Sequence, residues 1–231
     1  MAVTASMVKE LREMTGAGMM DCKKALSATD GDFDKAIEFL REKGLATAEK
    51  KAGRIAAEGL VATTIKDGDK VAAIVEVNAE TDFVAKNEVF QTFVKEVVEQ
   101  AADTDAADID AFKAEKWALD TSMTVDEKLA AMIAKIGENM NIRRFERYEG
   151  IVETYIHGGG RIGVIVVGSG EATDAVKEAL TNIAMQVAAM NPQYVSRDEI
   201  SAEELAKIRE ITLESALNDP FSLPKPILNE L

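Results

Sequence analysis

The stretch Glu76-Val-Asn-Ala-Glu-Thr-Asp-Phe-Val-Ala-Lys-Asn87 joins two different local patterns. Before it, residues 71–77 form an apolar run rich in Val, Ile and Ala, which is typical of a buried strand. After it, Phe and Val residues recur at helical spacing, which predicts a helix from Asp82 to Ala101. The stretch is therefore a strand-to-helix junction at the centre of an α+β unit.

Asp82 and Phe83 occupy the junction itself. A carboxylate at this point can cap the exposed N–H groups of a helix and meet the positive end of its dipole. From the spacing alone, the simplest interpretation is that Asp82 is only a helix cap and Phe83 only a core residue. A role for the pair in binding a partner stays open at this point.

The junction belongs to an internal repeat. Residues 59–78 align without gaps on residues 150–169 at a constant offset of 91. The identical pairs are Gly59/Gly150, Val61/Val152, Thr63/Thr154, Ile65/Ile156, Gly68/Gly159, Ile74/Ile165 and Val75/Val166. Each copy predicts a hairpin around a glycine-containing turn, followed by a helix, which runs from Thr173 to Met190 in the second copy. The repeat predicts two related subdomains, each an antiparallel sheet covered by a helix.

The two copies differ at the junction. Thr81-Asp82-Phe83 aligns on Ala172-Thr173-Asp174, so the second copy keeps a helix-capping group and lacks the Phe. A cap is therefore a shared structural need, whereas the Asp-Phe pair belongs to the first copy alone. This contrast favours an exposed Phe83 side chain that inserts into a partner.

Residues 1–45 are predicted to form a small module of three short helices. Gly16 and Gly18 separate the first two helices, and Gly44 is predicted to stop the third. Met19 and Met20, beside the glycine turn, are candidates for a partner surface because methionine adapts to irregular contacts. Inward packing of each Met is an equal alternative.

The rest of the chain divides by composition and periodicity. Residues 46–58 are predicted to be a partly helical linker, residues 59–149 the first subdomain and residues 150–191 the second, incomplete subdomain. The first subdomain is also predicted to contain a helix that Gly137 ends. Residues 142–148 are predicted to add a third strand to its sheet. Residues 192–231 are predicted to start a helical hairpin, with a helix that Ser201 opens and Asn218-Asp219-Pro220 ends.

Composition limits the function. The net charge of −14 argues against non-specific nucleic-acid binding, which relies on Lys and Arg at phosphates. Cys22 is the sole cysteine, which excludes an intramolecular disulfide and fits a reducing compartment. No signal peptide and no apolar run of ~20 residues is present, which predicts a cytoplasmic protein without membrane contact.

Catalytic chemistry is not indicated. His157 is the only histidine, and no pair of carboxylates stands out as an acid–base pair. Gly158–Gly160 joins two predicted strands instead of opening a helix, so it is not a phosphate-binding loop. We therefore expect a protein that is not an enzyme and needs no cofactor or metal.

Thr81–Asn87 resembles a signature of the bacterial elongation factor Ts family, the nucleotide-exchange factors of elongation factor Tu. Leu11–Leu26, Ile136–Arg144 and His157–Val164 resemble further stretches of that family, in the same order. Matches of this length in one order are far more specific than one short motif. The resemblance implies an α+β fold with an N-terminal module similar to ubiquitin-associated domains.

The resemblance also implies the function and the site. Asp82 and Phe83 would enter elongation factor Tu near its magnesium and phosphate site and promote GDP release. The N-terminal module and His157 would contact the partner's GTP-binding domain, and the helical hairpin can mediate formation of a homodimer. The partner-binding residues implied in this way are Asp82, Phe83, Thr81, Val84, His157, Leu11, Arg12, Met19, Met20 and Lys23.

One departure from the family and two alternative functions remain. Many family members continue past the hairpin and add a last strand to the second subdomain, so we expect the sequence to be a short form, a cut form or one completed by another chain. A scaffold that binds a peptide and dimerises would bind its partner without affecting nucleotide release. An acidic α+β enzyme with a phosphate ligand predicts direct nucleotide binding by this protein.

Overall fold

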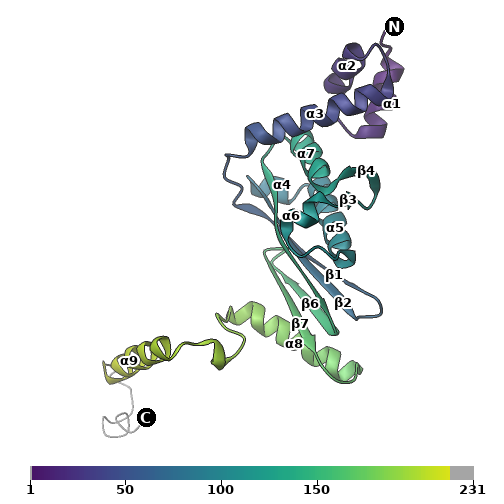
Figure 1. Cartoon of the computed structure of the whole chain (residues 1–231). Helices are drawn as coiled ribbons and strands as arrows, with labels where there is room; N and C mark the ends of the chain where they lie inside the picture. Colours follow the sequence, from purple (N-terminus) through teal and green to yellow (C-terminus); the bar gives the residue numbers. More distant parts are fainter. Residues whose placement is uncertain (1, 219–231) are drawn as a thin grey trace. The chain divides into compact units, whose positions relative to one another are not determined.

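The computed structural model describes residues 2–218. The chain divides into two compact units, Met1–Ala189 and Met190–Leu231. The first unit contains a helical N-terminal module followed by antiparallel sheets with helices, so the predicted α+β fold is confirmed (Figure 1). No helix within residues 2–218 has both the length and the apolar character required to cross a lipid bilayer.

The N-terminal module consists of α1 (Ala5–Thr15), α2 (Met19–Ala28) and α3 (Phe33–Lys51). Thr4 caps α1 by accepting the Met7 N–H, and Gly16 ends it in the left-handed conformation. A small apolar core joins the three helices, and its buried members are Val8, Leu11, Cys22, Ala25, Leu26 and Ala36.

The third helix is longer than predicted. Gly44 does not stop α3, which continues through much of the expected linker to Lys51. A Cβ at Gly44 would lie 3.7 Å from the Ala130 backbone on α7 (Val125–Ile136), so the glycine allows two helices to approach closely. The Lys51 ammonium also donates to the Gly137 carbonyl at 2.6 Å. The N-terminal module is therefore packed directly on the first subdomain.

The first sheet has the strand order β1-β2-β5, all antiparallel, with β1 (Glu58–Lys66), β2 (Val71–Ala79) and β5 (Met140–Glu149). The predicted third strand is β5. One face of the sheet packs on α5 (Glu88–Asp103) and α7 around an aromatic and aliphatic core. The stretch around Trp117, which sequence periodicity leaves unassigned, follows α6 (Ile109–Ala114) and forms the hairpin of β3 (Lys116–Trp117) and β4 (Asp120–Thr124).

The predicted helix after the junction is divided in two. A single turn, α4 (Asp82–Ala85), is followed by Lys86 and Asn87, and α5 then begins at Glu88. The Asn87 carboxamide accepts the Val89 N–H at 2.8 Å, which is the usual side-chain cap of a new helix. The prediction of one long helix is wrong at this break, although the apolar stripe of α5 is buried as expected.

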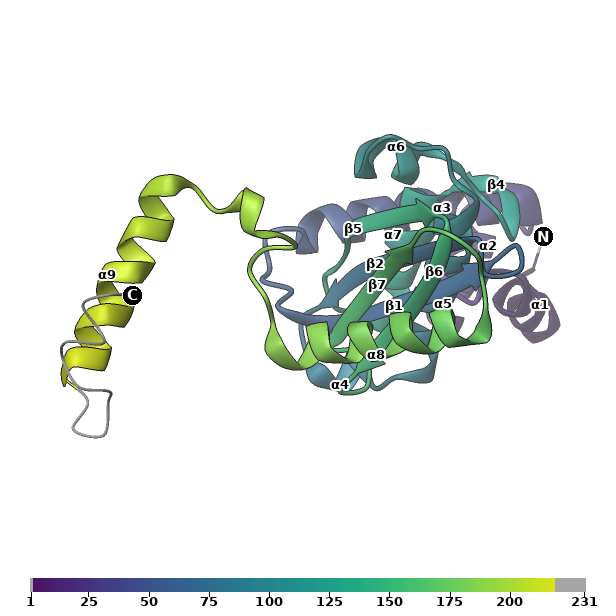
Figure 2. The same cartoon turned by 90° about the horizontal axis from the view of Figure 1, so that it is seen from below.

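The second copy of the repeat is the hairpin β6 (Ile151–His157) and β7 (Ile162–Gly168), followed by α8 (Asp174–Met190). It packs on the face of the first sheet that α5 leaves uncovered. Figure 2 shows α8 lying across β6 and β7, on the side away from β1 and β2. The order of layers is therefore helix, sheet, sheet, helix.

The two hairpins meet through equivalent residues. Thr63 donates its hydroxyl to Thr154 at 3.2 Å, and these two threonines are aligned partners in the repeat. The Val61 N–H donates to the Gly160 carbonyl at 2.7 Å, and the equivalent Val152 N–H donates to the Asp69 carbonyl at 3.4 Å. Such reciprocal bonds indicate an approximate two-fold relation between the two copies of the repeat.

The second unit contains a 3-10 turn at Arg197–Glu199 and α9 (Ala202–Asn218). Ser201 precedes α9 and accepts the Glu204 N–H at 3.2 Å, as predicted for the start of this helix. The rest of the predicted helical hairpin, including Asp219 and Pro220, lies outside the described residues.

Candidate partner-binding site

Thr81 directly precedes α4, and Asp82 and Phe83 are the first two residues of this helix. Thr81, not Asp82, is the cap, because its hydroxyl accepts the Val84 N–H at 3.4 Å. Phe83 is 81% exposed, which excludes the interpretation of a core residue. A large aromatic ring with so much exposed surface is typical of a residue that anchors a protein–protein contact.

Asp82 is the first residue of α4, and its carboxylate accepts from the Lys86 ammonium at 2.7 Å. The hydrogen bond and the charge of Lys86 lower the pKa of this carboxyl, and the charge of Arg161 lowers it further. Asp82 is therefore an anion at neutral pH, beside the hairpin turn that carries Arg161. Since the Asp82 side chain is 43% exposed, the anion is accessible to a partner.

His157 ends β6 and is exposed. Its Nδ1 lies 3.0 Å from the Tyr155 hydroxyl, two residues earlier on the same face of the strand. The following turn closes through the Arg161 N–H, which donates to the His157 carbonyl at 3.1 Å. Gly160 has a φ of +96°, and a Cβ there would lie 2.7 Å from the Leu60 side chain. The glycines thus allow the hairpin end to pack on β1 beside the junction.

Two of the predicted contact residues are buried. Val84 is 8% exposed and belongs to the core of the first subdomain. Leu11 is 0% exposed and lies in the core of the N-terminal module. The prediction of partner contact is corrected for these two residues: they support their exposed neighbours from below. Their helical spacing with other apolar residues is the signal that could have shown this.

The remaining predicted residues of the N-terminal module are exposed. Met19 and Met20 are 58% and 62% exposed, which decides between the two alternatives in favour of the surface. Arg12 and Lys23 are exposed on α1 and α2. Met14, near the end of α1, is also 59% exposed. Figure 1 shows α1 and α2 at the end of α3 that is distant from α4, so these residues form a separate surface from Phe83.

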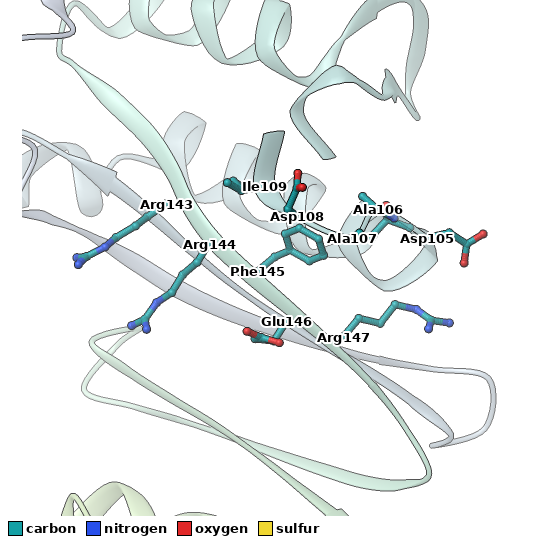
Figure 3. Close-up of a pocket in the computed structure, with 11 residues that line it drawn as sticks. Asp105, Ala106, Ala107, Asp108, Ile109, Arg143, Arg144, Phe145, Glu146 and Arg147 are labelled. Carbon is teal, nitrogen blue, oxygen red and sulfur yellow. Dashed lines mark hydrogen bonds between the residues drawn. The ribbon is translucent and has the colours of Figure 1, made fainter. Parts of the chain in front are cut away.

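A cavity of about 540 Å³ lies between the Thr104–Ile109 segment and β5. In Figure 3 the Phe145 ring faces this segment, whereas Arg143 and Arg144 extend away from it. Both arginines form ion pairs with Glu76, and Arg147 pairs with Glu149. Asp105, Asp108 and Glu146 also line the cavity. Because its positive charges are balanced, the cavity does not favour a phosphate ligand.

Comparisons with known proteins identify relatives along the whole chain. A family model described as elongation factor TS matches residues 80–230, and one described as UBA/TS-N domain matches residues 3–40. Elongation factor Ts of Clostridium novyi (strain NT) is 54% identical over 221 residues, which are 94% of this chain and 72% of that protein. Elongation factor Ts of Halothermothrix orenii is 48% identical over an alignment of 233 positions, which covers 100% of this chain and 77% of that protein.

Proposed function

The chain belongs to the elongation factor Ts family, and on that premise we propose that it is a guanine-nucleotide exchange factor that binds elongation factor Tu–GDP and promotes GDP release. The observation that carries this proposal is the junction. Phe83 is 81% exposed on a helical turn that follows β2, the central strand of a well-packed sheet. A large apolar side chain in that position is explained by a partner that covers it.

Asp82 and Phe83 act together in this proposal. Phe83 enters the partner near its magnesium and phosphate site and displaces the contacts that hold GDP. Asp82 brings a negative charge, which its Lys86 partner keeps ionised, into a site that is built to bind phosphate. Like charges repel strongly where water is partly excluded, so the pair weakens nucleotide binding.

No covalent step is needed. A factor that binds the nucleotide-free partner more tightly than the GDP-bound partner must weaken GDP binding by the same ratio, because the two equilibria are linked. The protein then promotes exchange without acting as an enzyme. The rate gain comes from a lower barrier to GDP release.

Two other surfaces hold the complex in this proposal. Arg12, Met19, Met20 and Lys23 of the N-terminal module contact the GTP-binding domain of the partner. His157 contacts the same domain from the hairpin beside the junction. The close packing of α3 on α7 holds the N-terminal module at a fixed distance from Phe83, so both surfaces can bind one rigid partner.

The test follows release of a fluorescent GDP analogue from elongation factor Tu. Strong acceleration by the native chain is expected, and Phe83→Ala should reduce the second-order rate about thirtyfold, the usual loss at a buried aromatic anchor. Asp82→Ala should also reduce it. Leu119→Ala is the matched control, because Leu119 is 70% exposed on the distant β3–β4 hairpin.

The alternatives give different results in the same assay. Tight binding without acceleration would show a scaffold and contradict the proposed function. Binding of the GDP analogue by this chain alone would indicate the phosphate-binding enzyme. Equal losses for Leu119→Ala and Phe83→Ala would contradict the assigned site.

A further inference from the structure

Glu138 lies in the short connection between α7 and β5. Gly137, in the left-handed conformation with a φ of +89°, ends α7 and directs the chain toward Met140 at the start of β5. The Glu138 side chain reaches Thr81, 57 residues earlier in the chain. Its Oε2 accepts the Thr81 backbone N–H at 3.0 Å, and its Oε1 accepts the Thr81 hydroxyl at 2.7 Å.

A further bond joins the same two segments in the opposite direction, and another ties the connection to Arg54. The Glu80 carboxylate accepts the Asn139 N–H at 2.5 Å, and the Asn139 side chain donates to the Arg54 carbonyl at 2.7 Å. Asn139 is only 9% exposed, so these bonds satisfy buried polar groups that would be costly to leave unpaired. The connection is thereby held in one position relative to Thr81.

The bonds to Glu138 determine the orientation of the Thr81 hydroxyl. Because the hydroxyl donates its hydrogen to Glu138, its lone pairs remain available to the Val84 N–H, which donates at 3.4 Å. The α4 helix that follows has only four residues. A helix of one turn is not stable by itself, so its conformation depends on its cap and its surroundings.

We propose that Glu138 is a positioning residue for Asp82 and Phe83: it fixes the Thr81 cap, so that α4 presents the exposed ring and the carboxylate in the geometry that the partner binds. This inference rests on the exchange function proposed above. Glu138 itself need not touch the partner. Its effect is to order the turn before binding, which removes an entropic penalty from association.

The second copy of the repeat shows that capping alone does not require such a carboxylate. Thr173 accepts the Val176 N–H at 3.3 Å, as Thr81 does for Val84. The Thr173 N–H donates to the nearby Glu171 carbonyl at 2.9 Å instead of a distant side chain. The additional carboxylate is present where the helix carries an exposed Phe, which connects Glu138 with the presentation of Phe83.

The test compares Glu138→Ala and Glu138→Gln with the control Glu115→Ala. Glu115 accepts the Thr104 hydroxyl at 2.5 Å elsewhere in the same subdomain, so its removal is a similar loss without an effect on α4. The carboxamide of Glu138→Gln can replace one of the two bonds to Thr81. It also keeps the side-chain volume, which guards against a variant that fails to fold.

GDP release from elongation factor Tu is the first measurement. Glu138→Ala should lower the second-order rate about tenfold, the factor that corresponds to a lost helix cap, with Glu138→Gln between it and the native chain. Glu115→Ala should match the native chain. In an Asp82→Ala/Phe83→Ala background, Glu138→Ala should have almost no further effect, because a positioning residue acts through the residues that it positions.

Hydrogen exchange of the isolated protein is the second measurement. The Val84 and Ala85 amides should exchange faster in Glu138→Ala and should be unchanged in Glu115→Ala. If the native chain accelerates GDP release and Glu138→Ala accelerates it equally, the positioning role is overturned and the proposed function stays intact. A full additional loss in the Asp82→Ala/Phe83→Ala background would also overturn it. No acceleration of GDP release by the native chain would overturn the proposed function and, with it, this inference.

Discussion

In the first copy of the repeat β2 lies between β1 and β5, whereas in the second copy β7 pairs, within residues 2–218, with β6 alone. The surrounding helices differ in the same way. The α5 helix contains eight buried residues, but α8 contains only three, Leu180, Ala184 and Ala188. Ile183 and Met185 on α8 are 49% and 46% exposed. The same hairpin thus has a full core in one copy and a thin one in the other.

The comparison separates the residues that build the fold from those that carry the proposed function. The reciprocal contacts between the hairpins occur in both copies, because both need them to pack. The exposed Phe83 and the carboxylate of Glu138 at its cap occur once. A well-packed first copy is a rigid support, on which an exposed aromatic side chain can keep one position.

Substitutions at the ends of the two hairpins should give the largest difference in the free energy of unfolding between equivalent positions. Gly160→Ala should lower the free energy of unfolding by about 3 kcal/mol, because its φ of +96° disfavours a Cβ that would also contact Leu60. Asp69, at the equivalent position in the first hairpin, already adopts a φ of 67° with a side chain. Asp69→Asn keeps a side chain at this φ and removes only the charge of a partly exposed ion pair with Lys177, so it should change stability by less than about 1 kcal/mol.

Urea unfolding followed by the fluorescence of Trp117, the single tryptophan, provides the measurement. Trp117 is buried in the first subdomain, so the signal reports on the loss of that core. If the two variants have equal stability, the close approach of Gly160 to β1 is not a constraint on the fold.

The two cores can be compared at the identical pair Val75 and Val166. Val75 is 1% exposed, whereas Val166 is half-buried in the thin second copy. Val75→Ala should cost about 2 kcal/mol of unfolding free energy and Val166→Ala less than about 1 kcal/mol, since the loss grows with burial and with the cavity that remains. Both changes replace Val by Ala in a strand, so they lower strand propensity equally. The difference between the two losses of unfolding free energy therefore reports on side-chain packing alone.

The same urea titration measures both variants. A loss for Val166→Ala as large as that for Val75→Ala would mean that the second copy is packed as well as the first. The comparison between the copies would then fail at its central point.

Sequence patterns predict the parts of this structure that depend on local periodicity. The strands of the two hairpins, the strand β5, the helices α7 and α8 and the repeat follow from apolar spacing and are confirmed, whereas β3 and β4 are not predicted. The break at Lys86 and Asn87 interrupts a continuous apolar stripe, although an Asn followed by Glu88 is a recognisable helix start. From the sequence, Gly44 is expected to stop a helix. Its actual role, the close approach to Ala130, cannot be predicted from local sequence because Ala130 is remote along the chain.

The site is predictable to a similar extent. The contrast between the two copies of the repeat predicts an exposed Phe83, and its 81% exposed side chain confirms this. Glu138 cannot be assigned in the same way, because its hydrogen bonds span 57 residues and leave no periodic pattern. Val84 and Leu11 show the opposite error: they lie within family signatures, but they are buried.

The smallest expected effect tests the two-fold relation itself. Thr63 and Thr154, equivalent in the repeat, are joined by one hydrogen bond of 3.2 Å between their hydroxyls. Thr63→Val and Thr154→Val should each lower the free energy of unfolding by about 1 kcal/mol, because each leaves the other hydroxyl unpaired. The double variant should be no less stable than either single one, since it removes both hydroxyls together.

Thr64→Val is the control variant. The Thr64 hydroxyl bonds Glu99 at the surface, so the loss of stability in Thr64→Val should add to that in Thr154→Val. Additive losses for Thr63 and Thr154 would show that the two copies pack without this contact, and the approximate symmetry would then rest on the backbone bonds at the hairpin ends alone.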